Sequence, residues 1–367
     1  MNSRILGVVA AAVMALSGCG SAVDDAGQGE GSIGSVGEAL SGAGLYTSGT
    51  FGGNGRACAT CHPTATGTFS AADAQARYSA DPGDPLFRAI DSDDGTGNSY
   101  ARLLTDATVL VGIDLPPNVK LAADPNATAV TFQRGTPTTL DTPALDPVLM
   151  WDGRAASLED QATGAITGHA QAVAPSQHDL GKIAAFEQKL FSSKTTKSYA
   201  EGGPAPALPA GTTDAEKRGA KWFDTSVPSG VCAHCHSGPM LNETNQFNVF
   251  NLPVGARFVT AFVSELNPKN RPVQTFIFTN PDATTTTVSS PDPGRALITG
   301  KVSDVNFFKI PTLWNIKNSA PYFHDNSSQT LEELVHHYNN FFTVATGGGL
   351  TLSAQDEADI LAYLMLL

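Results

Sequence analysis

The most informative pattern in this chain is Cys58-Ala59-Thr60-Cys61-His62, which recurs as Cys232-Ala233-His234-Cys235-His236. Two cysteines separated by two residues and followed directly by histidine form the signature of covalent c-type haem attachment. The two thiols join the haem vinyl groups, and the adjacent imidazole binds the iron. A zinc site or a redox dithiol is the alternative, but neither needs the trailing histidine at both copies. The sequence predicts two c-type haems, ligated by His62 and His236.

The fifth cysteine, Cys19, ends a segment that reads as an export signal. Arg4 precedes the apolar stretch 5–16, which is too short to span a bilayer. Leu16-Ser17-Gly18-Cys19 resembles a bacterial lipobox, and an ordinary secretory signal is the alternative. We expect a signal peptide at 1–18 and lipid-modified Cys19 as a membrane anchor. Residues 19–45, rich in glycine and free of Lys and Arg after Cys19, then form a flexible tether. The protein is predicted to be exported, facing the periplasm or the cell exterior.

Length and charge limit the class of protein. The chain has 367 residues, of which 16% are charged, with a formal net charge of -13. A nucleic-acid-binding protein needs a basic surface to displace counterions, so we expect no nucleic-acid partner. Because the two cysteine motifs are far apart, each haem is expected to have its own domain: an N-terminal haem domain at 46–175 and a C-terminal haem domain at 176–367.

Local signals predict a mostly α-helical fold of two cytochrome c-like haem domains with long loops and a minor β hairpin. Thr213, Thr330 and Ser353 each precede an acidic residue by three positions, which is typical of helix N-termini. Residues 179–191 have an amphipathic pattern and predict a linking helix. The stretch 273–278 is strand-like and is followed by a threonine run, which predicts a hairpin or long loop near the second haem.

Further blocks stand in a fixed order along the chain: Trp151-Asp152-Gly153-Arg154-Ala155-Ala156-Ser157-Leu158-Glu159-Asp160-Gln161-Ala162, Cys235-His236-Ser237-Gly238-Pro239, Phe308-Lys309-Ile310-Pro311-Thr312-Leu313-Trp314-Asn315 and Ala320-Pro321-Tyr322-Phe323-His324-Asp325. In this order and spacing they resemble the bacterial di-haem cytochrome c peroxidase/MauG family. The resemblance runs from about residue 50 to the C-terminus. The region 63–130 is longer than that pattern and is interpreted as an insertion.

The resemblance implies a division of labour between the haems. The N-terminal haem, ligated by His62, is expected to meet peroxide, and the C-terminal haem, ligated by His236, to relay electrons. Trp151 is expected to lie between the haems, with a plain core tryptophan as the alternative. The implied partners are hydrogen peroxide and a small electron-donor protein, either a cytochrome c or a cupredoxin.

The distal pocket departs from the family pattern. Twenty residues after the family's tryptophan stands a glutamate that shuttles a proton between the peroxide oxygens, and the matching residue here is Gln171. An amide cannot accept and return a proton. His169 is the candidate substitute, because a neutral imidazole has a suitable pKa, and a structural histidine is the alternative. Gln161 matches a distal-pocket glutamine of the MauG-like branch.

The second ligand of the C-terminal haem also follows the MauG-like branch. A methionine ligand of the peroxidases is replaced in that branch by tyrosine, and the matching helix position here is Tyr338. Phenolate stabilises ferric and higher oxidation states of iron, whereas a thioether favours the ferrous state. The neighbouring His336 and His337 remain alternative ligands.

A calcium ion between the haems is also implied by the resemblance. The expected carbonyl donors match Ser319 and Pro321. The side-chain donor of the family, an asparagine, is replaced here by Gly135, which places calcium in doubt.

Together these features predict a di-haem oxidoreductase that reduces hydrogen peroxide. MauG-like or rubber-oxygenase-like oxidation of an organic or protein substrate is one alternative, favoured by Tyr338 and Gln171. A non-enzymatic di-haem electron carrier is the other.

Overall fold

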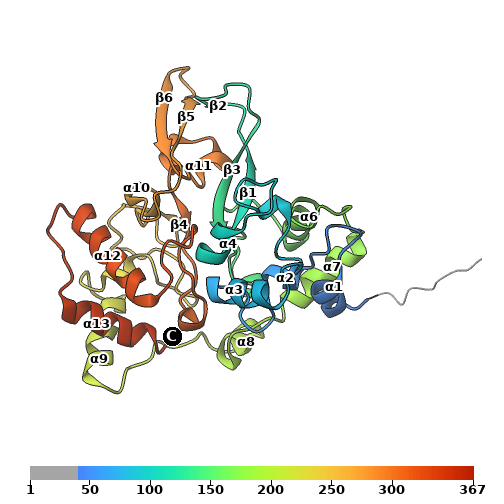
Figure 1. Cartoon of the computed structure of the whole chain (residues 1–367). Coiled ribbons are helices and arrows are strands. Elements are labelled where there is room, and N and C mark those ends of the chain that lie inside the picture. Colours follow the sequence, from blue (N-terminus) through green and yellow to red (C-terminus); the bar gives the residue numbers. More distant parts are fainter. Residues whose placement is uncertain (1–39) are drawn as a thin grey trace, which may run out of the picture. The chain divides into compact units, whose positions relative to one another are not determined.

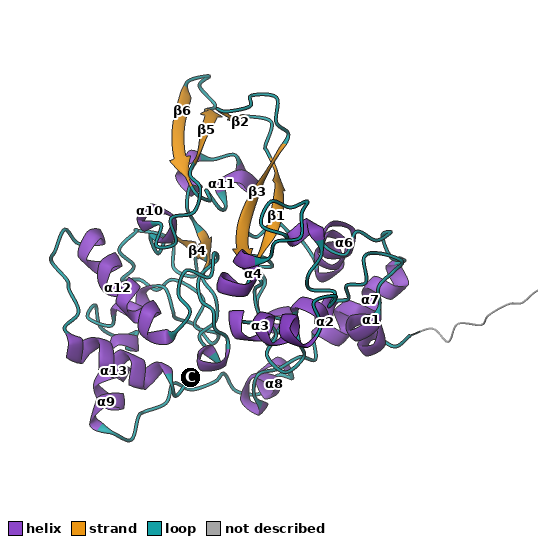
Figure 2. Cartoon of the chain, viewed as in Figure 1, coloured by secondary structure: helices purple, strands orange, loops and turns teal. Residues whose placement is uncertain are grey.

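Short helices joined by long loops make up most of residues 40–367, the part of the chain that the computed structural model describes (Figures 1 and 2). The predicted signal peptide, Cys19 and most of the predicted tether lie outside the described residues. Among residues 40–367, no helix combines the length and apolar character that a membrane crossing requires.

The helices are α1 (Gly42–Ser48), α2 (Cys58–Cys61), α3 (Ala71–Ala80), α4 (Ala101–Asp106), α5 (Thr142–Leu145), α6 (Leu158–Gly168), α7 (Gln177–Glu187), α8 (Lys194–Ala200), α9 (Asp214–Ala220), α10 (Val263–Leu266), α11 (Ala296–Thr299), α12 (Leu331–Ala345) and α13 (Ala354–Leu364). The strands are β1 (Thr108–Asp114), β2 (Val119–Leu121), β3 (Ala129–Gly135), β4 (Phe258–Val259), β5 (Gln274–Thr279), β6 (Thr285–Ser290) and β7 (Phe308–Lys309).

The predicted helix starts are confirmed by their capping bonds. Thr213, Thr330 and Ser353 are the N-cap residues of α9, α12 and α13, and each side chain accepts a bond from the backbone N–H three residues on. Such caps satisfy N–H groups that have no partner within the helix. The predicted helix at 179–191 exists as α7, but it begins two residues earlier and ends at Glu187.

The β structure is larger than predicted. The hairpin of β5 and β6 is confirmed, but β5 also pairs with β2 from the inserted region, and β1 pairs with β3 along their whole length (Figure 1). The prediction that the hairpin lies near the second haem motif is wrong. Phe276 and Phe278 are fully buried in a core that they share with Phe132 and other residues of the first half.

Two other cores surround the two cysteine motifs. One contains Tyr46 and Ile183 and packs against Cys58 and Ala59. The other is built mainly from α12 and α13 and packs against Cys232. Each cysteine motif therefore lies against its own apolar cluster, which is the surrounding that a porphyrin requires.

A buried ion-pair cluster connects segments that are far apart in sequence. Arg134, at the end of β3, is 1% exposed and binds Asp152 at 2.5 Å and Asp292 at 2.7 Å. Together with the β2–β5 pairing, it joins residues from both predicted domains. The predicted boundary between residues 175 and 176 stays a prediction.

Candidate haem sites

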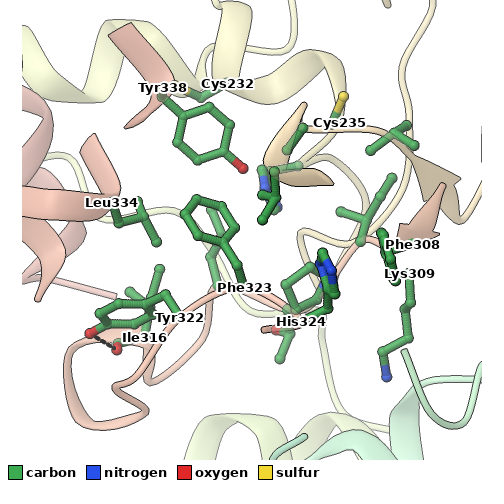
Figure 3. A pocket seen from close by; sticks show the side chains of 18 of the residues that line it. Cys232, Cys235, Phe308, Lys309, Ile316, Tyr322, Phe323, His324, Leu334 and Tyr338 are labelled. Atoms are coloured by element: carbon green, nitrogen blue, oxygen red, sulfur yellow. Dashed lines mark hydrogen bonds between the residues drawn. The ribbon is translucent and has the colours of Figure 1, made fainter. Parts of the chain in front are cut away.

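The C-terminal cysteine motif opens onto a mainly apolar cavity. Cys232, Cys235 and His236 line it from one side, and Leu334 and Tyr338 of α12 line it from another. Figure 3 shows the Tyr338 hydroxyl pointing into the space beside the Cys235 segment. A flat apolar group held between a histidine and a tyrosine would fill such a cavity, and these residues fit a c-type haem.

Hydrogen bonding prepares His236 to bind a metal. Its Nδ1 lies 2.8 Å from the Leu241 carbonyl oxygen, which can only accept a bond, so Nδ1 carries the proton. Burial lowers the pKa of His236 to about 4, which keeps the ring neutral and the Nε2 lone pair free. A backbone carbonyl that fixes the tautomer is the usual support of a metal-binding histidine.

The three candidate ligands of α12 have different surroundings. His336 is 66% exposed, and its Nδ1 lies 3.5 Å from a Glu357 carboxylate oxygen. His337 is buried and its Nε2 donates to the Ala261 carbonyl oxygen at 2.8 Å. Tyr338 lines the cavity with His236. Burial raises the pKa of Tyr338, so its phenol is protonated until a positive charge, such as that of ferric haem, enters the cavity.

The cysteine thiols have the chemistry of attachment points. Cys58, Cys61, Cys232 and Cys235 are all free thiols and partly exposed. Burial raises the pKa of Cys58, Cys232 and Cys235 to about 12. Redox-active dithiols instead have depressed pKa values, because the thiolate is their nucleophile. The thiols therefore fit haem attachment better than thiol exchange.

The N-terminal motif repeats the same arrangement. Cys58 and Cys61 are the first and last residues of α2, and His62 caps it. His62 Nδ1 donates to the Gly67 carbonyl oxygen at 2.9 Å, as His236 does to Leu241. The Tyr46 hydroxyl donates to the His62 carbonyl oxygen at 2.9 Å and so holds the motif against α1.

The residues predicted for the distal pocket lie on and after α6. Gln161 is partly buried within the helix, and His169 follows its last residue. Burial lowers the pKa of His169, Asp91 opposes this shift, and Arg56 adds to it. His169 also lies near enough to His62 for its charge to lower the pKa of the His62 ring, after the larger effect of burial. Gln171 is exposed, and its Oε1 accepts a bond from Asn54 at 3.1 Å.

Two charged residues beside this motif were missed by the sequence analysis. Arg56 donates to Asp91 at 2.5 Å, and the two side chains are 3% and 0% exposed. Arg56 also donates to the His169 carbonyl oxygen at 3.3 Å. Asp91 belongs to the inserted region, so the insertion supplies part of this site. The sequence does indicate this part of the site, because Arg56 is a charged residue only two positions before Cys58.

Trp151 connects the two sites through its backbone neighbours. It lines the same cavity as His236 and Tyr338, and its indole N–H donates to the Gly135 carbonyl oxygen at 2.8 Å. Thr68, the residue after the carbonyl that holds His62, donates to the Thr136 carbonyl oxygen at 2.8 Å. Covalent and hydrogen bonds thus run without a break from His62 to Trp151.

The residues expected around calcium are close to this connection. Ser319 and Pro321 line the cavity. The space beside Gly135 is taken by the Asn326 side chain, whose Oδ1 would overlap a Cβ added at Gly135. An amide from another segment therefore occupies the place where the family has its asparagine, and calcium binding stays a prediction.

Two histidines, each following a cysteine pair beside an apolar cluster and each held through Nδ1 by a backbone carbonyl oxygen, fit the attachment of two c-type haems. Residues 39–202 match the model of the family described as di-haem cytochrome c peroxidase. Two curated relatives are named as cytochrome c peroxidases, so the chain is similar to this family by both comparisons.

The first relative is the cytochrome c551 peroxidase of Nitrosomonas europaea, 27% identical over 224 residues, which are 54% of this chain and 56% of that protein. The second is the cytochrome-c peroxidase IdrP1 of Pseudomonas sp. strain SCT, 24% identical over 258 residues, or 59% of this chain and 63% of that protein. The chain thus spans less than two thirds of either relative.

A solved structure shares the fold. It is the crystal structure of a MauG-like protein associated with microbial copper homeostasis, with a TM-score of 0.50 and 18% identity over 88% of this chain and 87% of that chain. At this identity the likeness concerns the fold alone.

Proposed function

We propose that this protein is a di-haem peroxidase that reduces hydrogen peroxide with electrons from a small redox protein, a cytochrome c or a cupredoxin. The observation that carries the proposal is His169. It stands beside His62, the ligand expected for the N-terminal haem, and burial lowers its pKa so that the imidazole is neutral at neutral pH. A neutral imidazole within a haem pocket can accept and return a proton.

Reduction of one hydrogen peroxide consumes two electrons and two protons and yields two waters. Haem iron, when bound at both motifs, supplies the redox chemistry of this step. His169 takes the proton from one peroxide oxygen and returns it to the other as the O–O bond breaks. Gln161 offers an amide donor from α6, the helix that ends just before His169. Arg56 is fixed by Asp91 and keeps positive charge near the developing negative charge.

The C-terminal site receives the electrons. His236 and Tyr338 face one cavity, and Trp151 lines the same cavity while bonded to Gly135. The bonds from Trp151 through Thr136 and Thr68 to the His62 loop give a connected path between the two sites. Trp151 is thereby assigned as the relay between the haems.

A second function is favoured by Tyr338. A phenolate ligand stabilises oxidised iron, which suits MauG-like or rubber-oxygenase-like oxidation of an organic or protein substrate. Figure 3 shows the tyrosine hydroxyl turned into the cavity, as this ligation needs. The two functions differ in the fate of the oxidising equivalents: the peroxidase draws electrons from a donor protein, whereas the MauG-like enzyme takes them from its substrate.

Steady-state assays of the full haem-loaded chain separate these functions. Peroxide consumption is measured with a reduced cytochrome c, a reduced cupredoxin or no donor. The peroxidase proposal expects donor oxidation at two electrons per peroxide, and a Cys58→Ala variant, in which attachment of the N-terminal haem is disturbed, serves as control. If neither donor protein is oxidised while an organic or protein substrate is oxidised in the presence of peroxide, the peroxidase proposal is contradicted and the MauG-like function is favoured.

We further propose that the protein is exported and anchored by a lipid on Cys19. The support is the lipobox-like sequence of residues 16–19. Wild type should fractionate with membranes, and Cys19→Ser should release the protein or leave the signal uncleaved. Membrane binding of a Cys19→Ser form whose signal has been cleaved would contradict the lipid anchor.

A further inference from the structure

Glu187 is a buried carboxyl group that the proposed chemistry does not use. It is the last residue of α7 and only 4% exposed. On the same face of the helix, one turn earlier, Ile183 is fully buried in the core that packs against Cys58 and Ala59. Among residues 40–367, its carboxylate has neither a salt bridge nor a side-chain hydrogen bond. Buried acidic groups are normally paired, so an unpaired one calls for a physical role.

Glu187 has neighbours in the N-terminal haem motif and neighbours at the protein surface. Tyr46 of α1 and Cys58 of α2 lie near enough for the charge of Glu187 to raise the pKa of each. Tyr46 in turn bonds the His62 carbonyl oxygen. On the other side, Glu159 of α6 raises the pKa of Glu187 and lines a surface hollow.

That hollow is suited to proton exchange with solvent. Its lining includes Ala184 of α7 and Gln188, the residue directly after this helix, which stand on either side of Glu187 in the sequence, and the polar residues Asp146 and Ser157. Asp146 is held by Lys309 at 3.1 Å, whereas the Glu159 carboxylate has no partner among the described residues. Glu187 therefore interacts electrostatically with Glu159 at the hollow and with Tyr46 beside the haem motif.

We propose that Glu187 is a proton-binding group coupled to the N-terminal haem: it takes up one proton when that haem gains an electron and releases it when the electron leaves. The inference rests on the haem placement in the proposed function. The electron comes from the donor protein and the proton from solvent through the hollow, so the buried charge is the same in both redox states.

Electrostatics gives the sign of this coupling. Burial, followed by the charge of Glu159, raises the pKa of Glu187 to about 8. Ferric haem carries one more positive charge than ferrous haem, so it favours the carboxylate and lowers this pKa, whereas reduction restores it. The reduced state then binds the proton more tightly, and the midpoint potential of this haem falls as pH rises. Each tenfold difference in proton affinity between the two redox states corresponds to 59 mV.

The test is a redox titration of the full haem-loaded chain, with mediators and without peroxide, from about pH 6 to about pH 10. We expect one of the two potentials to fall with pH by up to 59 mV per unit between the two pKa values, and the other to stay nearly constant. Glu187→Gln should abolish the slope and keep the potential near the low-pH value of the parent, because glutamine resembles the neutral acid. Asp160→Asn, at an exposed carboxylate of α6, is the matched control and should keep the slope.

Two pH-independent potentials in the parent, or an unchanged slope in Glu187→Gln, would overturn the inference. If that variant does not accumulate with both haems, infrared difference spectra of the parent replace it: reduction should produce a protonated-carboxyl band that shifts in D₂O, and its absence would be equally decisive. Since no peroxide is used, a protein without peroxidase activity can still pass this test.

Discussion

Replacing Arg134 by methionine tests the buried cluster that positions Trp151. Arg134 is 1% exposed, and its guanidinium donates to Asp152 at 2.5 Å and to Asp292 at 2.7 and 2.9 Å. Burial alone would lower the pKa of Arg134, but the two carboxylates more than offset this and raise it. Methionine has a similar volume and no charge. Arg134→Met therefore leaves two buried carboxylates without their shared cation.

Removing one partner of a buried ion pair costs about 3–5 kcal/mol in the free energy of unfolding, because the remaining charge is uncompensated. Asp152 keeps a second partner, Arg154, at 3.0 Å. Among residues 40–367, the Asp292 carboxylate then keeps only the bond from the Gly294 N–H at 2.9 Å, and its side chain is 5% exposed. The loss is therefore set mainly by Asp292, and we expect a value within that range.

Urea unfolding of the haem-loaded protein measures this loss. Burial would raise the pKa of Asp152, but Arg134 and then Arg154 overcome it and lower the pKa. A lowered carboxyl pKa gives stability that is present above the unfolded-state pKa and lost as pH falls. In Arg134→Met this lowering is weaker, so the deficit against the parent should shrink as pH falls. Lys197→Met, at a pair 57% and 64% exposed, should change stability by less than about 0.5 kcal/mol. An Arg134→Met deficit below about 1 kcal/mol would show that Arg134 does not stabilise the fold by neutralising Asp152 and Asp292.

Three further predictions concern the haem sites. Mass spectrometry after denaturation should detect two covalent haems, and Cys58→Ala and Cys235→Ala should each disturb one of them. Zinc or a disulfide at either motif would contradict the haem assignment. Tyr338→Phe should change the spectrum and potential of the C-terminal haem and leave the other nearly unaltered; an unchanged spectrum would point to His336, His337 or another ligand. His169→Ala should slow the reaction with peroxide by about 10²–10⁴-fold, and a parent-like rate would disprove the substitution. In the parent, this reaction should slow as pH falls through the lowered pKa of His169, because imidazolium cannot accept a proton. Gln171→Glu in the His169→Ala background should restore turnover.

The helices and motifs could be predicted because their signals are local. A capping residue and an acidic residue three positions later lie within one turn, so Thr213, Thr330 and Ser353 mark α9, α12 and α13 without tertiary information. The His62 and His236 motifs are equally local, since attachment and ligation use five consecutive residues. The structure adds the carbonyl oxygens that fix each imidazole, which the sequence does not reveal.

The missed features all depend on residues that are distant in the chain. The pairing of β2 with β5 and the contact of Arg56 with Asp91 both involve the inserted region, for which the family pattern offers no template. Asn326 fills the space beside Gly135 from another segment, a substitution visible only in three dimensions. The burial of Glu187 could not be predicted from a sequence motif, because it follows from the tertiary packing of α7. Sequence reasoning could rank Tyr338 with its two neighbours but could not tell which one lines the cavity.

The coordination state of each haem in the resting and half-reduced protein, measured by electron paramagnetic resonance and optical spectra, tests the di-haem peroxidase proposal most directly. We expect the C-terminal haem to be six-coordinate, held by His236 and Tyr338. We expect the N-terminal haem to be five-coordinate and high-spin, or to become so on partial reduction, and then to react with peroxide. Two six-coordinate low-spin haems that stay closed on partial reduction would contradict this proposal and identify an electron carrier.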